Sequence, residues 1–319
     1  MIISLVKLSR SGILPKIKKV SGAQLIYNKL LDHNVKDVFL YSGGSIMPLI
    51  DKFYNNKIKY YINTHEQNSG HSATGYAKST GNIGVVISTS GPGLTNLITP
   101  ILDAMNDSTP LLVLSGQVGL KNMGTCAFQE APSVDITKSI TKWSYCLKNT
   151  DEIPEILDKA FGIANTGKKG PVHIDIPKCI LTNEVYLPFG HLNNYSFNDN
   201  YFRVLRKEIF NKNKFNDIIK IINKSKNPIF YVGQGSKHAS NELYHCIKKS
   251  NIPCTSTIHG KGIFPENEEL SLKWCGMHGM ASANFAIQQS DCIIAIGSRF
   301  DDRTTGNTEY YAPIAKKKK

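Results

Sequence analysis

Long hydrophobic runs are absent from this 319-residue sequence. A membrane-spanning helix needs about 20 consecutive apolar residues, and no segment approaches that length. CxxC pairs are also absent, and the seven scattered cysteines indicate reduced thiols in an intracellular protein rather than a zinc site. No GxxxxGK[ST] sequence occurs, which excludes a Walker phosphate loop.

Acidic residues are missing from both ends of the chain. Residues 1–20 hold five basic side chains and no acidic one, and the last four residues are lysines. These nine side chains carry most of the net charge of +13, because the rest of the sequence holds 29 basic and 25 acidic residues. A nucleic-acid-binding surface is therefore not expected. The first 20 residues resemble either a plastid or mitochondrial transit peptide or a short disordered arm, which would leave a cytoplasmic protein.

Apolar strands alternate with amphipathic helices along most of the chain. This order is typical of an α/β fold with mostly parallel sheets that are covered by helices on both faces. Ser21 and Gln24 have the spacing of a capping box at the start of the first helix. We expect further helices at 66–78, from 94, at 152–165 and at 215–224. We expect strands at 35–41, 58–62, 84–89, 111–115, 172–176, 229–232, 253–257 and 292–296.

The strand and helix pattern is lost over residues 186–211, which include Pro188, Gly190 and many asparagines. A linker is expected there. The sequence thus predicts a leader at 1–20, a first domain at 21–185, the linker and a second domain at 212–319. The second domain has three predicted strands, which make a narrow sheet with an unpaired edge.

Glu66 directly follows a predicted strand. Open α/β sheets bind ligands at the carboxyl ends of their strands, and a buried acid there is suited to sharing a proton with a cofactor nitrogen. The small residues Gly70, Ala73 and Ala77 of the following helix permit close packing around it. The alternative is a glutamate that the helix dipole alone favours at a helix start.

Two glycine-rich turns also follow predicted strands. The SGPG turn at 90–93 either holds an anion or is a plain connection between a strand and a helix. The GQG turn at 233–235 begins like a dinucleotide fingerprint, but His238 occupies its third glycine position. A nicotinamide dehydrogenase is therefore the weakest of the alternatives.

Five segments become informative together, in this order: HEQNSGHSATGYAKSTGNIGVVISTSGPG (65–93), SGQVGLKNMGTCAFQEAPSVDITKSITKW (115–143), GPVHIDIPK (170–178), GMHG (276–279) and GSRFDDRTTGN (297–307). They resemble the acetolactate synthase (acetohydroxyacid synthase) catalytic subunit family, which uses thiamine diphosphate. The resemblance covers about residues 21 to 315. It implies two doubly wound parallel-sheet domains: a thiamine-pyrimidine-binding domain and a truncated, Rossmann-like central domain of the FAD type.

The resemblance implies roles for individual residues. Glu66 matches the catalytic glutamate that hydrogen-bonds N1′ of the thiamine pyrimidine ring. Further thiamine diphosphate contacts are matched by Tyr41, Gly43, Gly44 and Gln129. The substrate entrance is matched by Ser108, Phe128 and Lys142, of which Lys142 could steer an anionic keto acid. FAD-contacting positions are matched by Lys168, Gly233, Gln234, Thr257, Ile258, Gly276, Met277, His278, Gly297, Arg299 and Asp301.

Departures from the family pattern concern single residues and a whole motif. Ser42 replaces a proline, Gln234 replaces a glycine near the flavin, and Lys168 replaces an arginine and loses its bidentate geometry. The family continues into a domain whose GDG…N motif binds Mg²⁺ and the diphosphate, and no GDG occurs in this sequence. We therefore expect a C-terminally truncated chain that has negligible activity by itself.

The implied function is a transferase step of branched-chain amino acid biosynthesis. Pyruvate is decarboxylated on thiamine diphosphate, and the two-carbon unit is transferred to pyruvate or 2-oxobutanoate. Implied cofactors are thiamine diphosphate, Mg²⁺ and a structural FAD. Implied partners are a second copy, since the family's active site lies between two subunits, and a regulatory small subunit. Two alternatives remain open: a related thiamine-diphosphate carboligase or decarboxylase, and a truncated, inactive family member.

Overall fold

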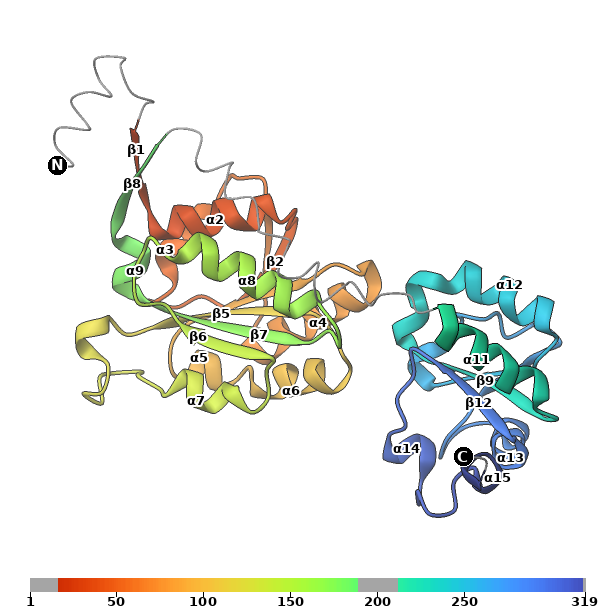
Figure 1. The fold of residues 1–319 in the computed structure, drawn as a ribbon. Coiled ribbons are helices and arrows are strands. Elements are labelled where there is room, and N and C mark those ends of the chain that lie inside the picture. The colour runs from red at the N-terminus through yellow and green to blue at the C-terminus, as the bar shows by residue number, and fades with distance from the viewer. Residues whose placement is uncertain (1–16, 189–211, 318–319) are drawn as a thin grey trace. The chain divides into compact units, whose positions relative to one another are not determined.

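The computed structural model describes residues 17–188 and 212–317, which divide into two compact units near residue 208. The first unit contains a six-stranded parallel sheet in the order β3-β2-β4-β5-β7-β6 (Figure 1). Its strands are β2 (Asp37–Leu40), β3 (Lys59–Ile62), β4 (Gly84–Ser88), β5 (Leu111–Gln117), β6 (Trp143–Cys146) and β7 (Pro171–Pro177). Its helices are α2 (Gly22–Asp32), α3 (Met47–Ile50), η1 (Asp51–Phe53), α4 (Glu66–Thr80), α5 (Pro92–Thr95), α6 (Ile98–Asn106), η2 (Leu120–Asn122), α7 (Ser133–Lys138), α8 (Ile153–Asn165) and α9 (Lys178–Thr182).

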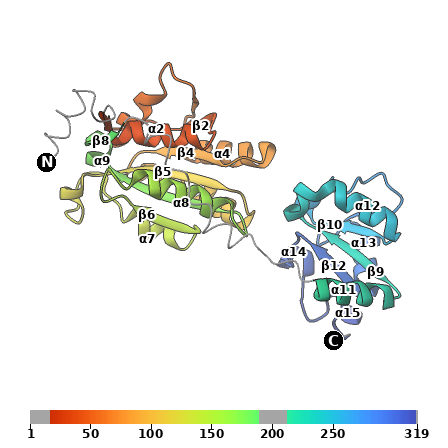
Figure 2. The ribbon, with the colours of Figure 1, turned by 45° about the horizontal axis from the view of Figure 1, so that its top comes forward.

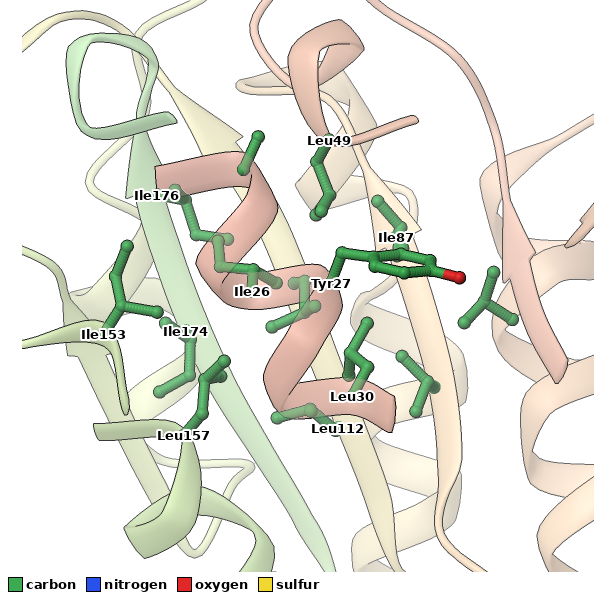
Figure 3. Close-up of a cluster of buried hydrophobic side chains, with 14 of the residues drawn as sticks. Ile26, Tyr27, Leu30, Leu49, Ile87, Leu112, Ile153, Leu157, Ile174 and Ile176 are labelled. Carbon is green, nitrogen blue, oxygen red and sulfur yellow. The ribbon is translucent and has the colours of Figure 1, made fainter. Parts of the chain in front are cut away.

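Helices cover both faces of this sheet because successive side chains of each strand point to opposite sides. Leu112 and Leu114 belong to the larger core cluster, which includes residues of α2, α3 and α8 (Figure 3). Leu111 and Val113 belong to a second cluster with residues of α4, α5 and α6. The small-residue face of α4 packs as expected, since a Cβ at Gly70 would lie 2.4 Å from Pro100 of α6.

A short antiparallel ribbon corrects two of the predicted boundaries. Strand β1 (Ile17–Ser21) pairs with β8 (Glu184–Pro188), and Lys19 forms an ion pair with Glu184 (Figure 1). The end of the predicted leader and the first residues of the predicted linker are therefore strands, because each supplies the other's backbone hydrogen bonds. Residues 1–16 of the leader and 189–211 of the linker lie outside the described residues.

The second unit contains a four-stranded parallel sheet in the order β11-β10-β9-β12. Strands β9 and β12 lie side by side in Figure 2, as their pairing requires. The strands are β9 (Pro228–Val232), β10 (Cys254–Ser256), β11 (Ser271–Trp274) and β12 (Cys292–Ile296). The helices are α11 (Lys212–Lys224), η3 (Gln234–Ala239), α12 (Ser240–Ser250), η4 (Ile258–Gly260), α13 (Ala281–Gln289), α14 (Asp302–Thr305) and α15 (Pro313–Lys317).

The α/β class with two parallel sheets, predicted from the sequence, is confirmed. Two strands of these parallel sheets were missed, because β6 and β11 are short and contain no valine or isoleucine. The second sheet consequently has four strands rather than three. Only half of the expected capping box forms: Ser21 Oγ accepts from the Gln24 amide at 3.3 Å, whereas the Gln24 side chain donates to Asn28.

Candidate functional site

Both sheets contain a place where the strand order reverses. In the first unit the chain runs from β2 outward to β3 and returns to β4, so the reversal lies between β2 and β4. In the second unit it lies between β9 and β12. Connections on the two sides of such a point leave for opposite faces of the sheet, which opens a crevice at the carboxyl ends of the strands. Ligand sites are therefore expected at both reversals.

Glu66 lies at the first residue of α4, next to the first crevice. Its side chain is buried, and the whole residue is 7% exposed. Asn96 donates its side-chain amide to Glu66 Oε2 at 2.9 Å. Glu66 Oε1 accepts no hydrogen bond from any described residue and lies toward the SGPG turn, 3.6 Å from the place of a Cβ on Gly93. The carboxylate thus keeps one oxygen available in a buried position.

The loop after β2 packs against the loop after β4. A Cβ at Gly43 would lie 2.3 Å from the Thr89 side chain, so only glycine permits this approach. Ser45 Oγ lies 2.9 Å from Thr89 Oγ1 and accepts from the Ser90 amide at 3.0 Å. The loop that contains the predicted contact residues Tyr41, Gly43 and Gly44 therefore packs beside the SGPG turn.

The loop after β5 brings Gln129 to the same turn. Gly91 has a positive φ of 56°, and a Cβ there would lie 2.6 Å from the Gln129 carbonyl oxygen. Gln129 itself has a φ of 59°. The Glu130 carboxylate accepts from the Gly124 amide and from the Ala127 amide at 3.1 Å, and these hydrogen bonds hold its pKa below its usual value. Glu66, the Gly43 loop and the Gln129 loop thus converge around the SGPG turn.

A buried polar network that the sequence reasoning missed lies beneath the Gln129 loop. Ser115 Oγ is 2.6 Å from Asp175 Oδ1 and 2.7 Å from His173 Nε2. Burial raises the pKa of Asp175 to about 6 and lowers the pKa of His173 to about 3. Gln117 Nε2 donates to Asp175 Oδ2 at 2.9 Å. Because side chains alternate along a strand, His173 and Asp175 lie on the same face of β7, and this spacing is the sequence signal that could have indicated the network.

The three predicted substrate-entrance residues do not lie together. Phe128 is next to Gln129 at the carboxyl edge and is 88% exposed. Ser108 and Lys142 precede β5 and β6, and so lie at the amino ends of the parallel strands, opposite the carboxyl ends where Phe128 lies. Lys142 Nζ donates to the carbonyls of Ile163 and, at 2.6 Å, Thr166. Burial, with a smaller contribution from Lys168, lowers the Lys142 pKa.

The predicted flavin-binding residues of the second unit all follow strand ends. Gly233 and Gln234 come after β9, and the others come after β10, β11 and β12: Thr257, Ile258, Gly276, Met277, His278, Gly297, Arg299 and Asp301. At the reversal point a Cβ on Gly233 would lie 2.4 Å from Gly297 O, so the two turns pack backbone to backbone. The exposed predicted FAD contact Lys168 belongs to the first unit.

Contacts within the second unit fix the shape of this edge. The Gly235 amide donates to Gly297 O at 2.9 Å, and the Met277 amide donates to Arg303 O at 2.8 Å. Asp301 caps α14 by accepting from the Thr304 amide at 3.0 Å. The apolar side chains of Ile258 and Met277 are exposed at this edge. Glycine backbone and exposed apolar groups suit a flat ring system with a polar chain.

Residues 17–188 and 212–317 contain no group of three or more acidic, histidine or cysteine side chains that could hold a metal ion. All seven cysteines are free. None of the described helices combines the length and apolar character that crossing a membrane would require.

Comparison with known proteins identifies the class to which both units belong. Residues 20–138 match the family described as thiamine pyrophosphate enzyme, N-terminal TPP binding domain. Residues 215–319 match the family described as thiamine pyrophosphate enzyme, central domain. The two matches together span most of the chain and both units. The chain therefore belongs to the thiamine pyrophosphate enzyme family.

Within this family the similarity lies with acetolactate synthases. The chain is 40% identical over 310 residues to the mitochondrial acetolactate synthase catalytic subunit of Saccharomyces cerevisiae, covering 93% of this chain and 44% of that protein. It is 42% identical to the acetolactate synthase large subunit of Corynebacterium glutamicum, over 94% of this chain and 47% of that protein. It is 40% identical to the chloroplastic acetolactate synthase 3 of Brassica napus, over 92% of this chain and 45% of that protein. The chain thus spans about half the length of these relatives.

Proposed function

We propose that this chain supplies the thiamine-activating half of an acetolactate synthase active site. The single observation that carries the proposal is the buried Glu66 carboxylate, with one oxygen held by Asn96 and the other available beside Gly93. Together with the acetolactate synthase relatives, it supports a proton-sharing role toward the pyrimidine ring. When bound, thiamine diphosphate would supply a nucleophilic carbon that adds to the ketone of a 2-keto acid, and a thiazolium ring that accepts the electron pair left by decarboxylation.

The chain's own residues are suited to hold and orient that cofactor. Burial of Glu66 excludes water, which would otherwise compete for the hydrogen bond to a ring nitrogen. Asn96 fixes the carboxylate, so that Oε1 is directed without a further loss of rotamer freedom. The loops of Gly43 and Gln129 border the same turn and would enclose the ring. Glu66 then acts by holding and returning one proton at Oε1.

The second unit is proposed to bind FAD at the β9–β12 reversal. The glycine junction of Gly233 with Gly297 and the exposed Ile258 and Met277 fit a flavin and its pyrophosphate linkage. A structural flavin is proposed, since the overall reaction exchanges no electrons with it. The Mg²⁺ and diphosphate ligands are proposed to come from outside the described residues. The proposed substrates are pyruvate and 2-oxobutanoate. The proposed partners are a second copy of the chain and a regulatory small subunit.

The proposed function is tested by replacing the carboxylate. In a protein that contains this chain and also supplies a diphosphate and Mg²⁺ site, Glu66→Gln should lower acetolactate formation from pyruvate by about 100-fold or more, because general acid–base groups contribute on that order. The matched control is Glu155→Gln, which alters an exposed glutamate in the first turn of α8. Equal activity of Glu66→Gln and the control would show that Glu66 merely starts a helix. The isolated chain is expected to form negligible acetolactate.

A further inference from the structure

One side chain closes the Gln129 loop at both of its ends. Gln117, the last residue of β5, is completely buried. Its Oε1 accepts from the Val118 amide at 2.9 Å, where the loop begins. Its Nε2 donates to Ala131 O at 2.9 Å and contacts Ser133 Oγ at 3.0 Å, where the loop ends. A single carboxamide therefore sets the distance between the two ends of residues 118–132.

This closure requires the carboxamide to have one particular orientation. A carboxamide flipped by 180° would direct Oε1 at Ala131 O and Nε2 at the Val118 amide, so both ends would be lost. Asp175 Oδ2, 2.9 Å from Nε2, permits only the donor to face it. Asp175 is 1% exposed, so water cannot take its place as the acceptor.

We propose that Asp175 is a positioning residue for the thiamine-binding loop, acting through Gln117 to place Gln129 against Gly91. The role of Gln129 in binding thiamine diphosphate rests on the proposed function, whereas the closure of the loop by Gln117 does not. Asp175 is not proposed to touch cofactor or substrate. It selects the orientation of Gln117, and Gln117 fixes the ends of the loop.

The rest of the network shows which property of Asp175 matters. Oδ1 faces Ser115 Oγ, which also lies 2.7 Å from His173 Nε2, and His173 Nδ1 lies 2.8 Å from Thr137 Oγ1. With a proton on Oδ1, the Ser115 hydroxyl can turn to donate to His173, and Oδ2 still accepts from Gln117. An acceptor oxygen at Oδ2, rather than a negative charge, is thus what the closure needs.

An isosteric pair of variants separates these properties. Asp175→Asn can direct its carbonyl at Gln117 and its amide at Ser115, so it should preserve the loop. Gln117→Glu has the same shape but no N–H donor, and it sets a second carboxyl against Asp175. Asp175→Ala removes the acceptor altogether. Only the last two variants should release the loop.

The measurement is hydrogen–deuterium exchange of the purified chain without cofactor, followed by mass spectrometry of peptides within 118–132. Amides at Val118, Gly124, Ala127 and Glu130 should exchange about tenfold faster or more in Gln117→Glu and Asp175→Ala, since local opening needs less free energy once buried hydrogen bonds are lost. Asp175→Asn should match the unmodified chain at these amides. Peptides of α2 and β4 are the control for global unfolding.

Two outcomes would overturn the proposal. One is unchanged loop exchange in Gln117→Glu, and the other is equally fast exchange in Asp175→Asn and Asp175→Ala. If Asp175→Ala unfolds the whole unit, the α2 and β4 peptides also exchange, and the isosteric pair still decides. If the loop behaves as proposed but Gln129→Ala leaves thiamine diphosphate affinity of the active protein unchanged, the positioning stands and the assignment of Gln129 fails.

Discussion

Both units have a crevice where the strand order of the sheet reverses, but different residues form the two crevices. In the first, the crevice between β2 and β4 is bordered by a buried carboxylate, Glu66, and rests on the polar network of Gln117, Ser115, His173 and Asp175. In the second, the crevice between β9 and β12 is a junction of glycine backbones. A site that must hold a proton needs buried ionisable groups, whereas a site that only binds needs space and backbone donors.

This difference predicts that acid destabilises the first unit before the second. Burial lowers the folded-state pKa of His173 to about 3, against an ordinary value of 6.5. Between these values the unfolded chain binds a proton that the folded unit does not, so stability falls as the pH falls from 6.5 to 3. At about 1.4 kcal/mol per pH unit, the loss is at most about 5 kcal/mol. The histidines of the second unit are all exposed.

Asp175 opposes part of this effect. Its pKa is raised from 3.8 to about 6, so the folded unit holds a proton that the unfolded chain has released, and stability rises as the pH falls from 6 to 4. The two tryptophans separate the units, because Trp143 lies in the first and Trp274 in the second. The free energy of unfolding in urea, followed by Trp143 fluorescence, should decrease toward pH 3. His173→Gln should remove this loss and leave only the opposite dependence that Asp175 contributes. A Trp143 transition that is independent of pH would contradict the expectation.

Ion pairs sharpen the same comparison. Lys29 and Asp158 form a buried pair of 2.7 Å between α2 and α8, and His33 bonds to the same carboxylate at 2.7 Å. Asp158→Asn leaves the buried Lys29 ammonium with only the more distant Asp32 carboxylate at 3.6 Å, which should cost the first unit about 3 kcal/mol in the Trp143 transition. Glu268→Gln breaks the solvent-exposed pair with Lys248 in the second unit and should shift the Trp274 transition far less. Equal shifts would mean that burial is not the deciding variable.

The glycine junction is expected to have a smaller effect than the buried ion pair. Gly233→Ala places a Cβ 2.4 Å from Gly297 O, and the backbone must move to relieve it. We expect a loss of about 2 kcal/mol in the Trp274 transition, typical of overpacking, with the Trp143 transition unchanged. Gly44→Ala is the matched control, since no atom lies within 4 Å of its added Cβ. If both substitutions are neutral, the junction is looser than its contacts indicate.

Much of the fold followed from local patterns. The buried strand β4 and the partly buried strand β12 are mostly apolar runs that end at glycine-containing turns, so both were placed within a few residues. Strands β1 and β8 could not be predicted because each exists only as the other's partner, 163 or more positions apart in the chain. Their local sequences contain mixed polar and apolar residues that carry no strand signal of their own.

In the candidate site, too, residues with a local sequence signal were predicted, and residues that depend on distant contacts were missed. Glu66 was found because a strand end and a family motif coincide at one residue. Gln117 and Asp175 were missed because their significance lies in a contact between residues 58 positions apart. Ser108 and Lys142 were grouped with Phe128 by resemblance alone, and parallel strands place them at the other edge of the sheet. Spacing along a sequence does not show which end of a strand a residue occupies.

The β1–β8 ribbon bears on how this protein can be engineered. Because Ile17–Ser21 and Glu184–Pro188 pair with each other, the described N-terminal and C-terminal ends of the first unit lie side by side. Fusion partners attached before residue 17 or after residue 188 should therefore leave the crevice of Glu66 intact, and residues 17–188 are a natural cassette for transplantation into another host protein.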